Sequence, residues 1–143
     1  MRYGFGHVAR AAGAAIVSAG FAASVAAQEG AITLELNRVI EAGDTCIVTM
    51  VIANGTGVDL GQLGYEIVSF GADGVVRDVL EFDFGVVTTV RPKVLQFTYA
   101  SRCAELQSLL VNGETRCGSF APAEEFCLNR LRTSSRVPTI QLR

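Results

Sequence analysis

The stretch Thr45–Ala53, TCIVTMVIA, decides the fold class of this chain. It is apolar on both of its faces, rich in β-branched residues, and too short to favour a helix. It ends at Asn54–Gly57, NGTG, a run of residues that favours a turn. The sequence therefore predicts a central β-strand that is buried on both sides.

The segments around this stretch alternate between apolar and polar residues with a period of two. In Ala31–Ile40, the side chains of Ile32, Leu34 and Leu36 share one face, which predicts a half-buried strand. Pro92 has no N–H for a strand ladder and therefore belongs at a strand entry or an edge. Further strands are expected at Leu63–Phe70, Val75–Phe84, Lys93–Tyr99, Leu128–Thr133 and Thr139–Leu142.

Turn and helix signals separate these strands. Asn112-Gly113 predicts a two-residue hairpin that joins Leu109–Val111 to a return strand at Glu114–Cys117. A helical turn is expected at Cys103–Ser108, and a short helix at Ala121–Phe126, entered at Pro122.

Seven or eight short strands with regularly spaced turns predict an all-β fold. The expected architecture is an antiparallel two-sheet sandwich, immunoglobulin-like in general form. The chain has no tryptophan, so the buried Trp of antibody domains is absent and the analogy is architectural. No repeat or linker divides the chain, and we expect one domain over residues 28–143.

Residues 1–27 have the order of segments typical of a secretory signal peptide. Arg2 and Arg10 precede the apolar run Ala11–Ala23, and the small residues Val25–Ala27 form a cleavage site. The apolar run is shorter than the ~20 residues that span a bilayer, so we expect cleavage and no stable membrane span. The alternative is an uncleaved anchor. The prediction places the mature chain in the periplasm or outside the cell.

Four cysteines remain after cleavage, and an oxidising compartment favours disulfides. Of the three pairings that four cysteines allow, we expect Cys46–Cys103 and Cys117–Cys127. The first would tie a central strand to the segment after Tyr99, as bridges between sheets do. No CxxC is present, and spacings of 57, 14 and 10 residues do not resemble a zinc site.

The mature sequence lacks the residue that most often acts as a general base. The only histidine, His7, lies in the predicted leader, so neither a Ser-His pair nor a histidine metal site is expected. Lys93 lies in Arg91-Pro92-Lys93, which indicates a solvated turn rather than a catalytic base. We therefore expect no catalytic residue, no cofactor and no metal.

The charge balance argues against nucleic acid as a partner. Cleavage removes two of the 12 Lys and Arg and none of the 14 Asp and Glu, which leaves a net charge of −4. Nucleic-acid binding needs clustered cations that displace counterions, and this sequence shows no such cluster.

Glu81 and Asp83 form the one polar pair with a chemical interpretation. They share a strand face with side chains about 7 Å apart, and paired carboxylates can bind calcium or act as acid and base. We favour the alternative of a solvated face balanced by Arg77 and Arg91, which leaves Glu81 and Asp83 as weak ligand-face candidates. Asn54–Thr56 also matches a glycosylation sequon.

Four strings resemble a known family of exported proteins: Leu80–Gly85 (LEFDFG), Arg91–Phe97 (RPKVLQF), Cys103–Leu106 (CAEL) and Leu110–Gly113 (LVNG). They are similar to small alphaproteobacterial proteins described as "Tat pathway signal sequence domain protein". The resemblance covers most of the mature chain and implies export, but no catalytic residues. Arg10 is followed by Ala11 and not by a second arginine, so the leader departs from the twin-arginine pattern.

Two classes of function follow from these observations. The leading hypothesis is a non-enzymatic β-sandwich that binds an envelope protein or supports an envelope complex. The alternative is a module for a small ligand or metal, using the Glu81 and Asp83 face or the loop near Cys117–Cys127. An enzyme would depend on carboxylates alone.

Overall fold

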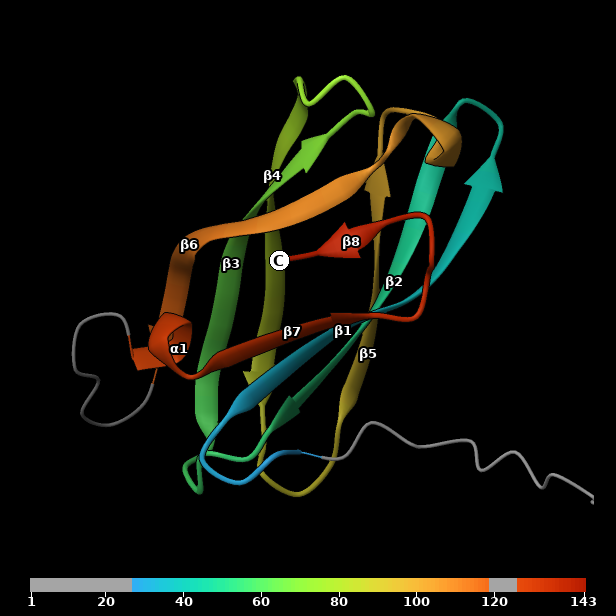
Figure 1. Ribbon diagram of the computed structural model, residues 1–143. Coiled ribbons are helices and arrows are strands. Elements are labelled where there is room, and N and C mark those ends of the chain that lie inside the picture. Colours follow the sequence, from blue (N-terminus) through green and yellow to red (C-terminus); the bar gives the residue numbers. More distant parts are fainter. Residues whose placement is uncertain (1–26, 119–125) are drawn as a thin grey trace, which may run out of the picture.

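A computed structural model describes residues 27–118 and 126–143, which form two four-stranded sheets packed face to face (Figure 1). The first sheet has the strand order β5-β2-β1-β7, with strands at Lys93–Tyr99, Thr45–Asn54, Ile32–Ala42 and Leu131–Ser135. The second has the order β4-β3-β6-β8, with strands at Val76–Val87, Leu60–Phe70, Ser108–Gly118 and Gln141–Leu142. A 3₁₀ turn, η1, spans Cys103–Glu105, and a single helical turn, α1, spans Phe126–Asn129.

The prediction of a buried central strand is confirmed. Strand β2 lies between β5 and β1 and is buried from Val48 to Asn54. Its inward side chains meet those of β1, β3 and β4 in one core. Phe82 of β4 stacks on Phe97 of β5 with ring centroids 3.8 Å apart, so these two edge strands lie side by side across the sandwich.

The sheets are mixed, and the prediction of an entirely antiparallel sandwich is wrong at two pairs. β7 runs parallel to β1, and β8 runs parallel to β6. Hairpins join β1 to β2 and β3 to β4, and both of those pairs are antiparallel. β7 and β8 instead reach their partners after the chain has crossed between the sheets, and a crossover permits parallel pairing.

The predicted hairpin at Asn112-Gly113 is also wrong. β6 continues through these residues along β3, where Glu66 is opposite Gly113 and Ile67 is opposite Val111. Asn112 is therefore the extra residue of a β-bulge, and its amide donates a 2.6 Å hydrogen bond to Glu66. Bulges and tight turns use similar residues, which explains the error.

The short helices are placed differently from the prediction. The turn near Cys103 is confirmed but ends at Glu105. Of the helix expected at Ala121–Phe126, residues 121–125 lie outside the described residues, and Phe126 opens α1. α1 includes Leu128, so the strand expected to begin there starts at Leu131 instead.

Both predicted disulfides are present. Cys46–Cys103 joins β2 to η1, and Cys117–Cys127 joins the end of β6 to α1. Two disulfide bonds suggest an oxidising compartment outside the cytoplasm. Within the described ranges, no helix has the length and apolar character needed to cross a membrane. The predicted leader lies outside these ranges except for Ala27.

Two tyrosines, Tyr65 and Tyr99, are fully buried in the core. The Tyr65 hydroxyl donates a 3.1 Å hydrogen bond to the carbonyl of Cys127, whereas the Tyr99 hydroxyl has no partner among the described residues. Burial raises the pKa of both phenols, and the charges of Glu114 and Asp78 raise it further.

We expect these tyrosines to make the fold sensitive to alkaline pH. Below pH ~10 the two phenols are protonated in both the folded and the unfolded chain. Above this pH the phenols of the unfolded chain lose their protons, whereas those of the folded chain keep them. The free energy of unfolding should then fall by up to about 2.7 kcal/mol per pH unit, about 1.4 for each phenol. In a chain that begins at Gln28 and so lacks Tyr3, absorbance at 295 nm and circular dichroism would report phenolate only as the fold is lost.

Tyr65→Phe is the matched control, because it removes one phenol and should halve the slope. A reversible titration of either Tyr65 or Tyr99 at its ordinary pKa, with an unchanged circular dichroism spectrum, would contradict the prediction.

Candidate functional site

Glu81 and Asp83 lie on the outer face of the second sheet, as their shared parity predicts, but their cation is Arg116 of β6. Arg116 lies 3.3 Å from Glu81 and also donates a hydrogen bond to Asp83. The expected balance by Arg77 and Arg91 is wrong, since Arg77 pairs with Asp73 at 2.9 Å.

Gly64 explains how Arg116 reaches these carboxylates. On β3, between β4 and β6, it stands opposite both Asp83 and Arg116. A Cβ added to Gly64 would lie 2.7 Å from the Thr115 hydroxyl. Because the glycine leaves this space open, the arginine and the carboxylates meet over β3. A glycine inside a strand pattern is the sequence signal for such a close approach.

The carboxylate pair has little freedom to bind another ligand. Thr115 donates a 2.9 Å hydrogen bond to Glu81, and the Gly85 N–H donates a 2.8 Å hydrogen bond to Asp83. A divalent cation would have to displace Arg116 from both acids. Exposed ion pairs of this kind contribute roughly 0–1 kcal/mol, so the cluster is best described as a solvated polar face.

A second acidic group lies beside the Cys117–Cys127 disulfide. Oxygen and sulfur atoms of Glu114, Cys117 and Cys127 lie within 4.8 Å of one another. The two sulfurs are bonded together, and Glu114 accepts a 2.7 Å hydrogen bond from the Leu128 N–H of α1. The disulfide ties β6 to α1, and Glu114 caps a backbone N–H of α1, so this group has a structural role.

The sequon asparagine is engaged within the fold. Asn54 is only 1% exposed, and its amide donates hydrogen bonds to the carbonyls of Val58 at 2.8 Å and Val87 at 3.1 Å. A glycan on this nitrogen would replace one of the two N–H donors and would need space that the buried side chain lacks, so the folded chain does not present Asn54 as an acceptor.

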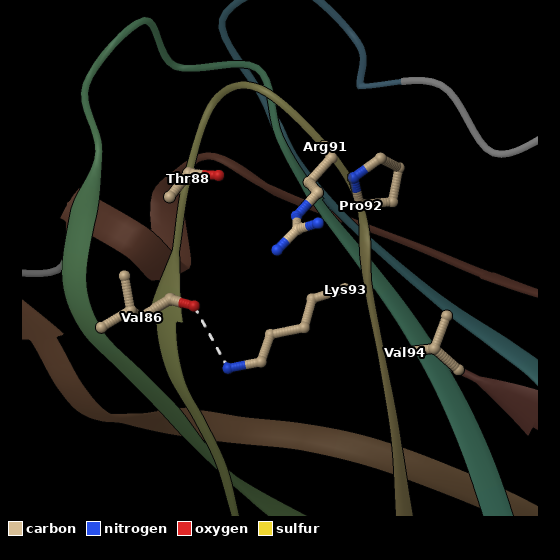
Figure 2. Close-up of a pocket in the computed structure, with 6 residues that line it drawn as sticks. All are labelled: Val86, Thr88, Arg91, Pro92, Lys93 and Val94. Atoms are coloured by element: carbon tan, nitrogen blue, oxygen red, sulfur yellow. Dashed lines mark hydrogen bonds between the residues drawn. The ribbon is translucent and has the colours of Figure 1, made fainter.

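A concavity lies between the end of β4 and the start of β5 (Figure 2). We name it the β4–β5 groove; it has a volume of about 420 Å³. Figure 2 shows the guanidinium of Arg91 and the ammonium of Lys93 pointing into the space between the two strands. The groove is lined by Val86, Thr88, Arg91, Pro92, Lys93 and Val94.

Lys93 is not the solvated turn residue that the sequence predicted. It opens β5, is half-buried, and donates hydrogen bonds to the carbonyls of Phe84 at 2.6 Å and Val86 at 3.2 Å. Neither Phe84 nor Val86 has a register partner in β3, because the pairing is irregular around Gly85. Lys93 thus covers the carbonyls of two β4 residues that have no register partner in β3. No serine lines the groove, so a Ser-Lys pair is not assembled there.

Exposed large apolar side chains concentrate in one stretch of the chain, from the turn before β4 to the start of β5. Of the seven large apolar side chains that the described part exposes, six lie between residues 75 and 94. Val90 is 86% exposed and Val94 is 62% exposed. Sequence reasoning missed this feature, although valines flanking the Arg91–Lys93 string were its visible signal. The six are Val75, Val76, Val79, Val86, Val90 and Val94.

Comparison with known proteins leaves the site to be interpreted from its own residues. The chain matches no protein-family model, no curated protein and no solved structure.

Proposed function

We propose that this chain is an exported, non-enzymatic binding module that docks an envelope protein on its β4–β5 side. The β4–β5 side comprises the edge strands β4 and β5 and the connection between them. The observation that carries the proposal is that five of the seven large apolar side chains exposed in the described part belong to these segments: Val76, Val79, Val86, Val90 and Val94. Exposed apolar side chains gathered on one side of a soluble domain are typical of an interaction surface.

The strand order supports docking at this side. β4 and β5 are the edge strands of the two sheets, and they have 12 and 7 residues. The opposite edges, β7 and β8, have only 5 and 2 residues. A long edge strand offers free backbone N–H and C=O groups, to which an extended segment of a partner can add as another strand.

The chemistry of the chain supports binding rather than catalysis. The sequence after the predicted leader has no histidine, and Glu81 and Asp83 both pair with Arg116. The leader and the two disulfides support export to the periplasm or beyond. The proposed scaffold is a sandwich of generally immunoglobulin-like form that two disulfides cross-link.

Site-specific crosslinking tests the docking side directly. A photoreactive residue at Val90 should give a discrete crosslinked product in envelope extract, and one at Gln141 on the opposite edge should not. Adding Val94→Glu should reduce the Val90 product at least fivefold, because a charge would replace an apolar contact. Gln141→Glu is the matched control and should leave it unchanged.

Circular dichroism melts would first show that these variants fold. Equal crosslinking from Val90 and Gln141, or a Val90 product unaffected by Val94→Glu, would overturn the proposal.

A further inference from the structure

We propose that the β4–β5 groove binds an acidic side chain of the partner, presented by an extended segment with aliphatic residues two positions away on either side. This inference rests on the proposed docking side and names what that side recognises. Arg91 and Lys93 would bind the partner's carboxylate, and Val86, Val90 and Val94 would contact its aliphatic neighbours.

The charges of the groove are not neutralised by the chain. Its lining includes two cations and no acidic residue. Arg91 makes no hydrogen bond or ion pair with any residue of the described part, and both hydrogen bonds of the Lys93 ammonium go to neutral carbonyls. Arg77, Arg102 and Arg116 pair with carboxylates, whereas Arg91 and Lys93 share one groove without a carboxylate partner. A chain of net charge −2 therefore keeps two unneutralised cations side by side.

The chemistry of these cations favours a carboxylate. A guanidinium presents parallel N–H donors that match the two oxygens of a carboxylate, and an ammonium adds a point charge beside it. The walls are Val86, Pro92 and Val94, with no aromatic ring on which a nucleobase could stack. An aliphatic stem that ends in a carboxylate, as in Glu or Asp, suits both parts of the groove.

The edge strands determine how this side chain would arrive. An extended segment places every second side chain on the same face, about 7 Å apart. With the acidic residue in the groove, we assign the residues two positions away on the same face to the exposed valines of this side, Val86, Val90 and Val94. The recognised pattern is therefore aliphatic-x-acidic-x-aliphatic.

A peptide titration tests the inference. The probe is acetyl-Val-Thr-Glu-Thr-Val-amide, and its control replaces Glu with Gln. Isotope-labelled, disulfide-bonded protein would be titrated while backbone amide shifts are followed. The Glu peptide should shift amides in residues 86–94 and bind at least about tenfold more tightly than the Gln peptide, which corresponds to ~1.4 kcal/mol. Salt should weaken this binding, because the contact is ionic and partly exposed.

Matched variants identify the cations. Arg91→Gln should weaken the affinity for the Glu peptide about tenfold, and Lys93→Gln should also weaken it. Arg132→Gln, an exposed arginine on the opposite edge strand β7, should change it less than twofold. Sodium hexanoate provides a free aliphatic acid. Equal or tighter binding of hexanoate would show that the groove takes a free acid, which overturns the peptide assignment.

The carboxylate inference and the docking proposal can fail separately. Equal binding of the Glu and Gln peptides, or no shift in residues 86–94, would overturn the carboxylate inference. If the Val90 crosslink still depends on Val94 in that case, the docking side stands without charge recognition. Loss of that crosslink, with Glu-selective peptide binding retained, would overturn the docking proposal and leave the groove as a carboxylate site.

Discussion

Replacing Cys46 and Cys103 together by alanine is expected to lower the free energy of unfolding by about 4 kcal/mol. The bridge joins residues 57 apart in sequence, so its loss frees a long loop in the unfolded chain. Cys46 is also fully buried in the core, and truncation removes packed atoms there. Because small domains are stable by only ~5–15 kcal/mol, this change removes a large share of the total.

Urea unfolding followed by circular dichroism would measure the effect. The matched control is the double alanine variant of Cys117 and Cys127, whose separation of 10 residues predicts a smaller loss, about 3 kcal/mol. A larger loss from the Cys117 and Cys127 variant would contradict the assignment of the main constraint to Cys46–Cys103.

Phe82→Ala should have a comparable effect, with a loss of about 3–5 kcal/mol in the free energy of unfolding. Phe82 is fully buried, stacks on Phe97 and lies 5.9 Å from Tyr99, measured between ring centroids. Its ring fills the space between the edge strands β4 and β5, so truncation leaves a cavity where the two sheets meet.

Val79→Ala is the control on the same strand. Val79 is 50% exposed, and its truncation should change stability by no more than about 0.5 kcal/mol. If Phe82→Ala lost less than about 1 kcal/mol in the same urea experiment, the packing of β4 against β5 would differ from that described. The docking side would then lack its rigid support.

The candidate site was only partly predictable. Residue parity placed Glu81 and Asp83 on one exposed face, but it could not identify Arg116, which lies 33 residues from Asp83 in sequence. That contact depends on the register of three strands and on the missing side chain of Gly64. The groove also escaped prediction, because it forms only where the ends of β4 and β5 approach each other.

The sequence by itself determined most of the strands and their buried faces, although it divided β6 in two at Asn112-Gly113 and began β7 too early. A period of two and the apolar run at Thr45–Ala53 act locally, so they need no knowledge of the partner strand. The disulfide pairing was also correct, although spacing alone left three alternatives.

Only the tertiary structure decided which strands pair and in which direction. Alternation defines which face of β7 or β8 is buried, but it is the same for a parallel and an antiparallel neighbour. The crossovers that make β7 parallel to β1 and β8 parallel to β6 bring the remaining strands into place. They leave β4 and β5 as the long edges, with Arg91 in the connection between them and Lys93 at the start of β5. Strand pairing depends on contacts between distant residues, and a local pattern does not contain that information.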